Sequence, residues 1–210
     1  MNNKSFKSTT LCLIFVIPLL SSCIDDMLKA KRLNGEWRSK YVTSFETGEK
    51  DSTVQNITFT YDEDATDDDG TFVEKRDCKT NTIEDEGYRY TVHYTSSISG
   101  RYEVLAGDLY VKYDLNSLEL SLGQDDVSIA PSSLSAAYGM ITMAISLVNI
   151  RQTLAESCRK EVYQNLFNMY KLNSSDDTSY QNLNVTFRKM SYDTTDGKIE
   201  FYNTLYGKDD

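Results

Sequence analysis

Alternating apolar and polar residues fill most of the chain after Asn34, and this alternation predicts short β-strands. Leu109, Val111 and Tyr113 share one face of a strand, because successive side chains point to opposite sides of a sheet. Leucines at 118, 120 and 122 repeat the pattern in the next strand, so this face is expected to be the core side. The predicted strands are 36–45, 54–61, 71–76, 88–98, 100–105, 109–114, 117–122, 185–190 and 199–202.

A stretch from about 131 to 172 interrupts the strands with helical spacing. Its apolar stripe comprises Leu134, Tyr138, Ile141, Ile145 and Val148, followed by Leu154, Cys158, Val162, Leu166 and Tyr170. A break near 149–152 predicts two helices, and one long helix is the alternative. No charged residue lies between Val127 and Ile150, so the first helix is expected to be buried, with a membrane span as the other possibility.

These patterns predict a mainly antiparallel β fold of about 8–10 strands, a barrel or a meander sheet, with one or two helices before the last strands. Residues 34–210 form one domain in this interpretation, with the helical insertion at about 131–172. The short spacing between strands favours sequential antiparallel pairing.

The N-terminus has the features of a secretory signal, with Lys4 and Lys7 before an apolar run from Leu11 to Leu20. The sequence Leu20-Ser21-Ser22-Cys23 resembles the lipobox of bacterial lipoproteins. This resemblance implies that residues 1–22 are removed and that acylated Cys23 anchors the protein in the outer membrane of a Gram-negative bacterium. An ordinary secretory signal and an N-terminal membrane anchor are the alternatives.

Residues 23–33 are expected to form a charged tether behind the anchor. Asp25 and Asp26 resemble the acidic export tag of some surface lipoproteins, which implies a place on the outer face of the cell. A solvated tether without a targeting role explains the same two carboxylates.

The segment Asn34-Gly35-Glu36-Trp37 resembles the Gly-x-Trp start of lipocalin-like domains, and Gly100-Arg101-Tyr102 resembles one of their middle strands. The resemblance implies that Trp37 plugs the closed end of a barrel that can hold a small apolar ligand. Tyr138 and Ile141 of the helical insertion are further candidates to line the ligand site or the barrel mouth. Trp37 as an ordinary core aromatic is the alternative. Lipocalins usually carry their helix after the eighth strand, so the insertion before the last strands departs from the family.

Charge and cysteine content narrow the choices of partner and compartment. Loss of residues 1–22 would change the formal charge from −10 to −12, which opposes binding to nucleic acid or to anionic phospholipid headgroups. Cys78 and Cys158 remain after Cys23 is acylated, and in an oxidising envelope compartment they are expected to pair as a disulfide. Two unrelated buried thiols are the alternative.

The chain offers little to a catalytic mechanism, so no enzyme activity, cofactor or metal site is predicted. His93 is the only histidine, and its neighbours place it on the polar face of its strand. The acidic run 62–70 has Ala65 and Arg76 where an EF-hand loop needs carboxylates, so a solvated hairpin loop is expected.

Two functional hypotheses follow for a membrane-anchored, non-enzymatic protein of the envelope or cell surface. The first is a lipocalin-like binding protein that holds a small apolar ligand. The second is a structural or protein-interaction subunit of an envelope complex, with a self-filled core and helices that dock a partner. An empty cavity lined by Trp37 would favour the first, and a packed core would favour the second.

Overall fold

The computed structural model describes residues 24–44, 50–62, 69–85, 88–131, 144–173, 180–186, 188–194 and 206–208. The strands are β1 (Gly35–Ser44), β2 (Lys50–Tyr61), β3 (Asp69–Asp85), β4 (Tyr88–Leu105), β5 (Asp108–Tyr113), β6 (Glu119–Ser121), β7 (Val127–Pro131), β8 (Tyr180–Val185), β9 (Lys189–Thr194) and β10 (Tyr206–Lys208). Two short 3-10 turns, η1 (Leu115–Ser117) and η2 (Gln124–Asp126), separate β5, β6 and β7. The helices are residues 24–33 and α3 (Ala144–Asn173).

Eight strands form a nearly closed antiparallel barrel in the order β3-β2-β1-β10-β9-β8-β5-β4, and pairing of β4 with β3 completes the ring. The expected mainly antiparallel β-barrel, with helix α3 between the middle and last strands, is confirmed. The links around the ring differ greatly in length. β3 and β4 pair from Asp69↔Glu103 to Asp85↔Tyr88, whereas β5 and β8 pair only at Leu109↔Tyr180 in the described residues.

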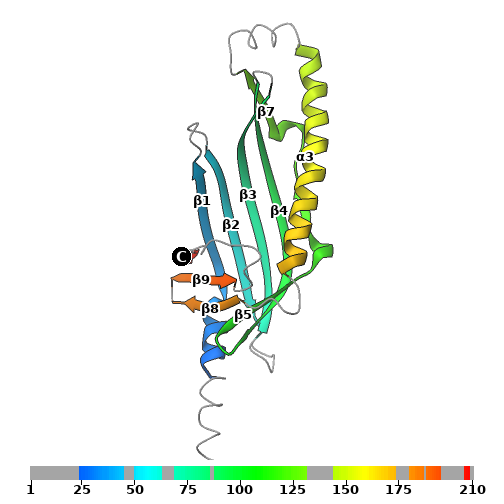
Figure 1. The fold of residues 1–210 in the computed structure, drawn as a ribbon. Helices are drawn as coiled ribbons and strands as arrows, with labels where there is room; N and C mark the ends of the chain where they lie inside the picture. The colour runs from blue at the N-terminus through cyan, green and yellow to red at the C-terminus, as the bar shows by residue number, and fades with distance from the viewer. Residues whose placement is uncertain are drawn as a thin grey trace, which may run out of the picture.

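The molecule is elongated because β4 extends well beyond the ring (Figure 1). Along one edge, β4 pairs in turn with β7, β6 and β5, while β3 follows its other edge. The lower part of β4 therefore belongs to the barrel, and the upper part belongs to an open sheet. At 3.3 Å per residue, the 18 residues of β4 span roughly 60 Å.

Helix α3 lies along the sheet beside β4 (Figure 1) and contacts β5, β7 and both 3-10 turns. Its stripe from Leu154 to Tyr170 packs inward, as predicted from the spacing. Leu166 and Tyr170 join the main core cluster, and Ala155 joins a smaller cluster with Leu122 and Val127. The helix thus covers the inner face of the sheet where the ring opens.

The helix at 24–33 packs against the opposite end of the molecule from the first turns of α3 (Figure 1). Ala30 and Leu33 are fully buried in the same core cluster as Trp37. These residues were expected to form a tether, and the structure differs because their apolar side chains dock onto the barrel. The helix therefore belongs to the folded domain.

The structure corrects several predicted strand boundaries, and β3 runs from Asp69 to Asp85 where only 71–76 was expected. β4 runs unbroken where separate strands 88–98 and 100–105 were expected, and Gly100 sits within it because the Phe72 ring and the Lys112 carbonyl leave no room for a side chain. The predicted strand 185–190 instead contains a turn between β8 and β9, closed by the Thr186 N–H donating to the Lys189 carbonyl at 2.8 Å. β7 and β10 were not predicted, and residues 199–202 lie outside the described residues.

The predicted helix break at 149–152 is wrong, because α3 continues through this segment. Two i,i+4 bonds span it, from Thr153 Oγ1 to the Asn149 carbonyl at 3.0 Å and from Gln152 to Glu156 at 3.2 Å. Val148 was expected on the buried stripe but is 55% exposed. The helix extends past the core clusters, whose first helical member is Leu154.

Candidate functional site

Trp37 on β1 is completely buried at the end of the barrel against which the helix at 24–33 packs. Its indole Nε1 donates to the Leu33 carbonyl at 2.6 Å, and Lys208 Nζ lies 5.3 Å from the ring centroid. Trp37 therefore joins β1 to the N-terminal helix and to β10. This is a packed core environment at one end of the ring, in which the indole N–H is satisfied by protein.

Aromatic side chains fill the space between β2, β3, β4 and α3. Phe59 contacts Phe72 and Tyr102 at centroid distances of 5.9 and 5.0 Å. Tyr113 in turn contacts Phe72 at 5.1 Å and Tyr170 at 4.6 Å. These distances are those of directly packed rings, so the described interior is occupied by the protein's own side chains.

An ionic centre lies within this aromatic core, at the junction of the sheet and α3. Glu74 is only 1% exposed and pairs with Arg76, whose Nε donates to Oε1 at 2.6 Å. The Tyr170 hydroxyl donates to Oε1 at 2.9 Å, and the Tyr113 hydroxyl donates to Oε2 at 3.0 Å. Arg76 also lies over the Tyr170 ring, with Cζ 5.4 Å from its centroid, and donates to Met169 Sδ at 3.7 Å. The carboxylate is thus fully satisfied by three partners.

The pKa shifts at this centre keep Arg76 charged and Tyr170 neutral. Burial lowers the pKa of Arg76, but the Glu74 carboxylate together with Tyr170 and Tyr113 outweighs this effect and holds the pKa well above its ordinary value. Burial raises the pKa of the Tyr170 hydroxyl, and the neighbouring Glu74 charge raises it further. The centre has the character of a structural ion pair, in which Arg76 stays charged and the Tyr170 hydroxyl stays protonated near neutral pH.

Tyr102 and Ser96 are buried in the same face of β4, and their hydroxyl oxygens have no hydrogen-bond partner in the structure. Burial raises the pKa of Tyr102, and the nearby Tyr61 and Asp69 add to the shift. Gly70 lies against the Tyr102 ring, where an added Cβ would stand 2.9 Å from the hydroxyl oxygen. Neither hydroxyl contributes a bond to the ionic centre.

The helix at 24–33 is held to the barrel end by polar contacts. Asp26 is 5% exposed, and its carboxylate accepts from the backbone N–H groups of Ala106 and Gly107 at 2.9 and 2.8 Å. These two residues form the β4–β5 turn with positive φ angles of 53° and 87°, in agreement with the predicted turn at 106–108. Asp26 therefore has a structural role in addition to any role in targeting.

The other end of this helix is tied to β2 and β10. Asn34 Oδ1 accepts from the Tyr61 N–H at 3.3 Å, and Lys208 Nζ donates to the Asn34 carbonyl at 2.6 Å. Lys31 Nζ lies 5.7 Å from the Tyr61 ring centroid. The first and last described strands of the ring thus meet at the helix end.

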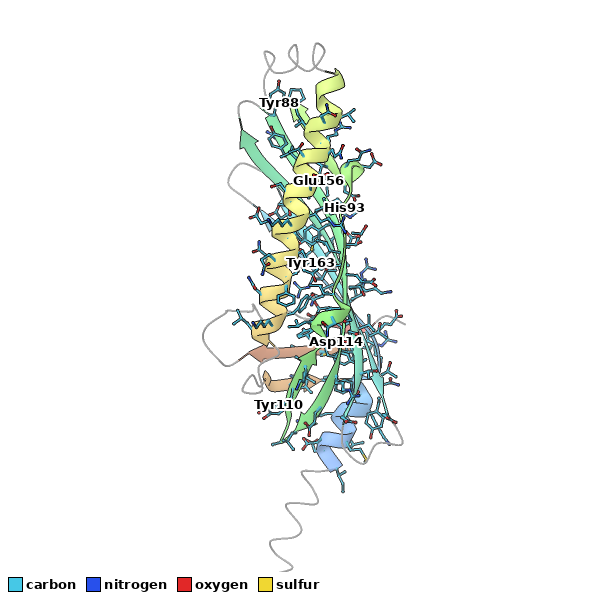
Figure 2. All side chains as sticks on the ribbon, turned by 90° about the vertical axis from the view of Figure 1, so that its right-hand side faces the viewer. Tyr88, His93, Tyr110, Asp114, Glu156 and Tyr163 are labelled. Carbon is cyan, nitrogen blue, oxygen red and sulfur yellow. The ribbon has the colours of Figure 1, made fainter. Side chains whose placement is uncertain are left out.

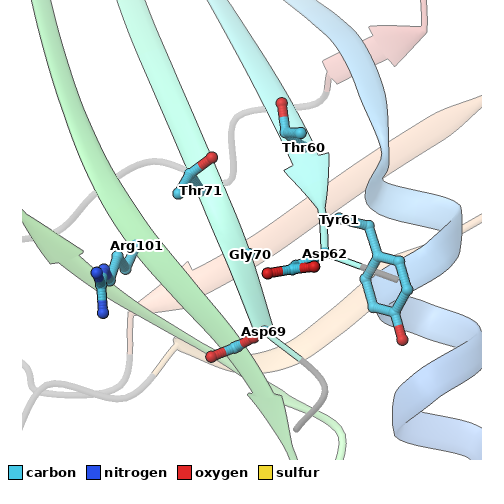
Figure 3. A pocket seen from close by; sticks show the side chains of 7 residues that line it. All are labelled: Thr60, Tyr61, Asp62, Asp69, Gly70, Thr71 and Arg101. Atoms are coloured by element: carbon cyan, nitrogen blue, oxygen red, sulfur yellow. The ribbon is translucent and has the colours of Figure 1, made fainter. Parts of the chain in front are cut away.

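Among the described residues, two pockets lie along the long strands, and Trp37 lines neither of them. The larger, of about 360 Å³, lies between the ends of β2 and β3 beside Arg101 of β4 (Figure 3). It is lined by Thr60, Tyr61, Asp62, Asp69, Gly70, Thr71 and Arg101. The smaller, of about 250 Å³, is lined by Asn56, Lys75, Arg76, Asp77, Thr95, Ser96, Ser97, Glu119 and Ser121. Both pockets are lined mainly by residues with polar or charged side chains, whereas sites for small hydrophobic ligands are lined mainly by apolar and aromatic side chains.

Asp62 and Asp69 point into the larger pocket from neighbouring strand ends (Figure 3). The remainder of the acidic run, residues 63–68, lies outside the described residues. Within the part of the chain that the structure describes, no group of three or more His, Cys, Asp or Glu side chains is arranged to hold a metal ion.

His93 lies on the polar face of β4, where the alternation predicted it, and is halfway along the molecule (Figure 2). Its side chain is 45% exposed, and Nε2 lies 2.8 Å from Asp77 Oδ1 on β3. Asp126 is 3.9 Å from Nδ1. Among the residues that the structure describes, no serine or cysteine side chain is hydrogen-bonded to this imidazole.

Cys78 and Cys158 are free thiols in the structure, in contrast to the expected disulfide. Cys78 is buried on β3, close enough to Tyr170 to affect the tyrosine's pKa. Cys158 lies almost three and a half turns earlier on α3, against the smaller core cluster. This offset along the helix separates the thiols. Burial raises the pKa of Cys158, with a contribution from Glu161, which disfavours its reactive thiolate form.

The remaining predicted site residues, Cys23, Tyr138 and Ile141, lie outside the described residues. The ionic centre was not predicted. Neither were the hydrogen bonds from the Ala106 and Gly107 N–H groups to the Asp26 carboxylate, which we call the Asp26 clamp. The alternation along β3 could have indicated the ionic centre. Glu74 and Arg76 lie between Phe72 and Cys78 at every second position, so all four share the inward face of the strand. A carboxylate and a guanidinium on that inward face must be paired to be buried.

None of the helices in the described residues is long and apolar enough to cross a membrane. No protein-family model matches the chain, and no curated protein matches it.

Proposed function

We propose that this chain is a lipid-anchored, non-enzymatic protein of the Gram-negative outer membrane that works as a structural or protein-interaction subunit. The observation that carries the proposal is the close packing of the described side chains inside the barrel. Trp37, Tyr102, Tyr170 and Glu74 are each less than 2% exposed, and their neighbours form one connected core cluster. This favours the self-filled alternative over a barrel that holds a small apolar ligand.

The anchor in this proposal rests on the lipobox-like sequence ending at Cys23 and on the helix that begins at the next residue. A lipid at Cys23 would leave almost no free chain between the membrane and the barrel, because Asp26, Ala30 and Leu33 are all buried. Such a short connection suits a subunit that is held at a fixed place in a complex.

Cys23→Ser tests the anchor, since one acylated residue would supply the membrane attachment. The variant should lose acyl labelling. The mature, processed form should be absent from detergent extracts of outer membranes. Mass spectrometry of the intact wild-type protein should find the mass of residues 23–210 with added acyl chains. An unmodified Cys23 in a membrane-bound wild-type protein would refute the lipoprotein assignment.

Native mass spectrometry of wild-type protein purified from its own membranes tests the mode of action. We expect a complex with a second protein chain and no small molecule retained by the isolated barrel. A bound apolar molecule of a few hundred daltons, released only when the barrel unfolds, would instead favour the binding-protein hypothesis.

A further inference from the structure

Exposed apolar side chains gather at the end of the molecule where the described chain begins. Ile24 is 54% exposed, Leu28 is 43% exposed and Leu105 is 53% exposed. Ile24 and Leu28 are four residues apart, so they share one face of the helix at 24–33. Asp26 points to the other side of this helix, where it is buried.

Leu105 belongs to the same surface because of the Asp26 clamp. It is the last residue of β4 and directly precedes Ala106 and Gly107, whose N–H groups donate to Asp26. The clamp thereby fixes the first turn of the helix beside the β4–β5 turn. We name Ile24, Leu28 and Leu105 the apolar tip.

The charge of the helix at 24–33 differs in sign from that of the whole chain. The helix carries Lys29, Lys31 and Arg32 against Asp25 and Asp26, whereas the whole protein has a formal charge of −10. Lys31 and Arg32 are exposed, and long basic side chains can extend toward lipid phosphates while their stems lie on apolar surface. The combination of apolar and basic residues is typical of helices that lie at a membrane interface.

We infer that the apolar tip inserts into the lipid monolayer that holds the acyl chains of Cys23. The inference rests on the proposed lipid anchor, because Cys23 directly precedes Ile24 in the chain. The barrel then stands on the membrane at a set angle, with the N-terminal end of α3 at the far end of the molecule from the lipid (Figure 1). The anchor and the tip together form one rigid membrane-contacting end.

Tryptophan scanning with acylated protein in phosphatidylcholine vesicles tests the inference. Leu28→Trp and Leu105→Trp place a reporter in the tip, while Val42→Trp and Val148→Trp place it at sites of similar exposure, 47% and 55%, away from the tip. Wild-type Trp37 is fully buried and supplies the same background in every variant. The quencher is phosphatidylcholine with brominated acyl chains, which acts over a short distance.

We expect brominated lipid to quench the tip reporters at least about twofold more than the control reporters, because interfacial helices place their apolar face about 5–10 Å into the headgroup and acyl boundary. Equal quenching at all four sites in protein that sediments with the vesicles would overturn the tip insertion and leave the anchor intact. Protein that carries no acyl chains and does not sediment would overturn the anchor, and the tip insertion with it.

Discussion

Glu74 is a carboxylate with almost no exposed surface, and its three partners come from three separate elements. Arg76 lies on the same strand, while Tyr113 comes from β5 and Tyr170 from α3. A buried ion pair gives little net stability over an apolar core, but removing one partner leaves an uncompensated charge. The centre therefore specifies how α3 sits on the sheet more than it adds to stability.

Glu74→Ala should lower the free energy of unfolding by about 3–5 kcal/mol, because Arg76 would remain charged and buried. The double variant Glu74→Leu with Arg76→Met should lose much less. Urea unfolding monitored by circular dichroism measures both. If the double variant is as unstable as the single one, the ion pair stabilises the fold by more than the neutralisation of two buried charges.

Tyr102 and Tyr170 should respond in opposite directions to replacement by phenylalanine. Tyr102→Phe removes a buried hydroxyl without a partner, so the free energy of unfolding should rise by about 1 kcal/mol. Tyr170→Phe removes a hydrogen bond to a carboxylate and should cost about 1.5–3 kcal/mol. Thermal melting at neutral pH compares the two variants directly. The assignment fails if Tyr102→Phe is the more damaging change.

The raised pKa of Tyr170 also predicts alkaline sensitivity. The folded state holds this proton above the ordinary tyrosine pKa near 10, so the stabilisation is complete below that pH and is lost as the pH rises further. Melting temperatures between pH 8 and pH 11, in about half-unit steps, should fall less steeply for Tyr170→Phe than for the wild type. Parallel profiles would exclude Tyr170 as a source of the decline.

At the scale of elements, the helix at 24–33 is the part whose role differs most from the expectation. Its two aspartates are adjacent in sequence but have different surroundings. Asp25 is 63% exposed and pairs with Lys29 at 3.2 Å, whereas Asp26 is buried and holds the β4–β5 turn. A stability comparison therefore separates the packing role from a role in export.

Asp26→Ala should lower the free energy of unfolding by about 2–4 kcal/mol, because two N–H groups lose a charged acceptor. Asp25→Ala is the matched control and should change it by no more than about 0.5 kcal/mol. Hydrogen exchange at Ala106 and Gly107 should accelerate in the first variant alone. Equal effects of the two substitutions would show that the clamp contributes little in solution.

Elements with a strong local pattern were predictable from the sequence. Alternation identified β5 with its inward Leu109 and Tyr113, and helical spacing identified the inward face of α3 from Leu154 to Tyr170. The short strands β7 and β10 were not predictable, because each depends on pairing with a distant strand. Strand parity indicated that Glu74 and Arg76 face inward, but no local pattern indicates that Tyr170 reaches Glu74.

At the scale of the whole molecule, the ring closes through contacts between the two ends of the described chain. Trp37 pairs with Lys208 and Arg38 pairs with Gly207 across β1 and β10. The Tyr206 hydroxyl donates to Gln55 Oε1 at 2.9 Å within the core. Contacts of such large sequence separation form late in folding and slow it.

Deletion of residues 206–210 should open the ring, because β1 and β9 both lose their pairing with β10. We expect a broadened thermal transition and faster exchange of backbone amides in β9. Tyr206→Phe is the control, since it removes only the bond to Gln55 and should retain a sharp transition. An unchanged transition in the deletion variant would mean that β10 is dispensable for closure.

The unequal strand links have a mechanical consequence. Tension along the length of β3 and β4 loads the whole ladder from Asp69↔Glu103 to Asp85↔Tyr88 in shear, so its bonds must yield together. Tension across the ring loads the β5–β8 link, whose register in the described residues includes the one pair Leu109↔Tyr180 and which can yield before the long ladder does. The molecule is therefore stiff along its axis and compliant across it, and force spectroscopy in the two directions should give clearly different rupture forces.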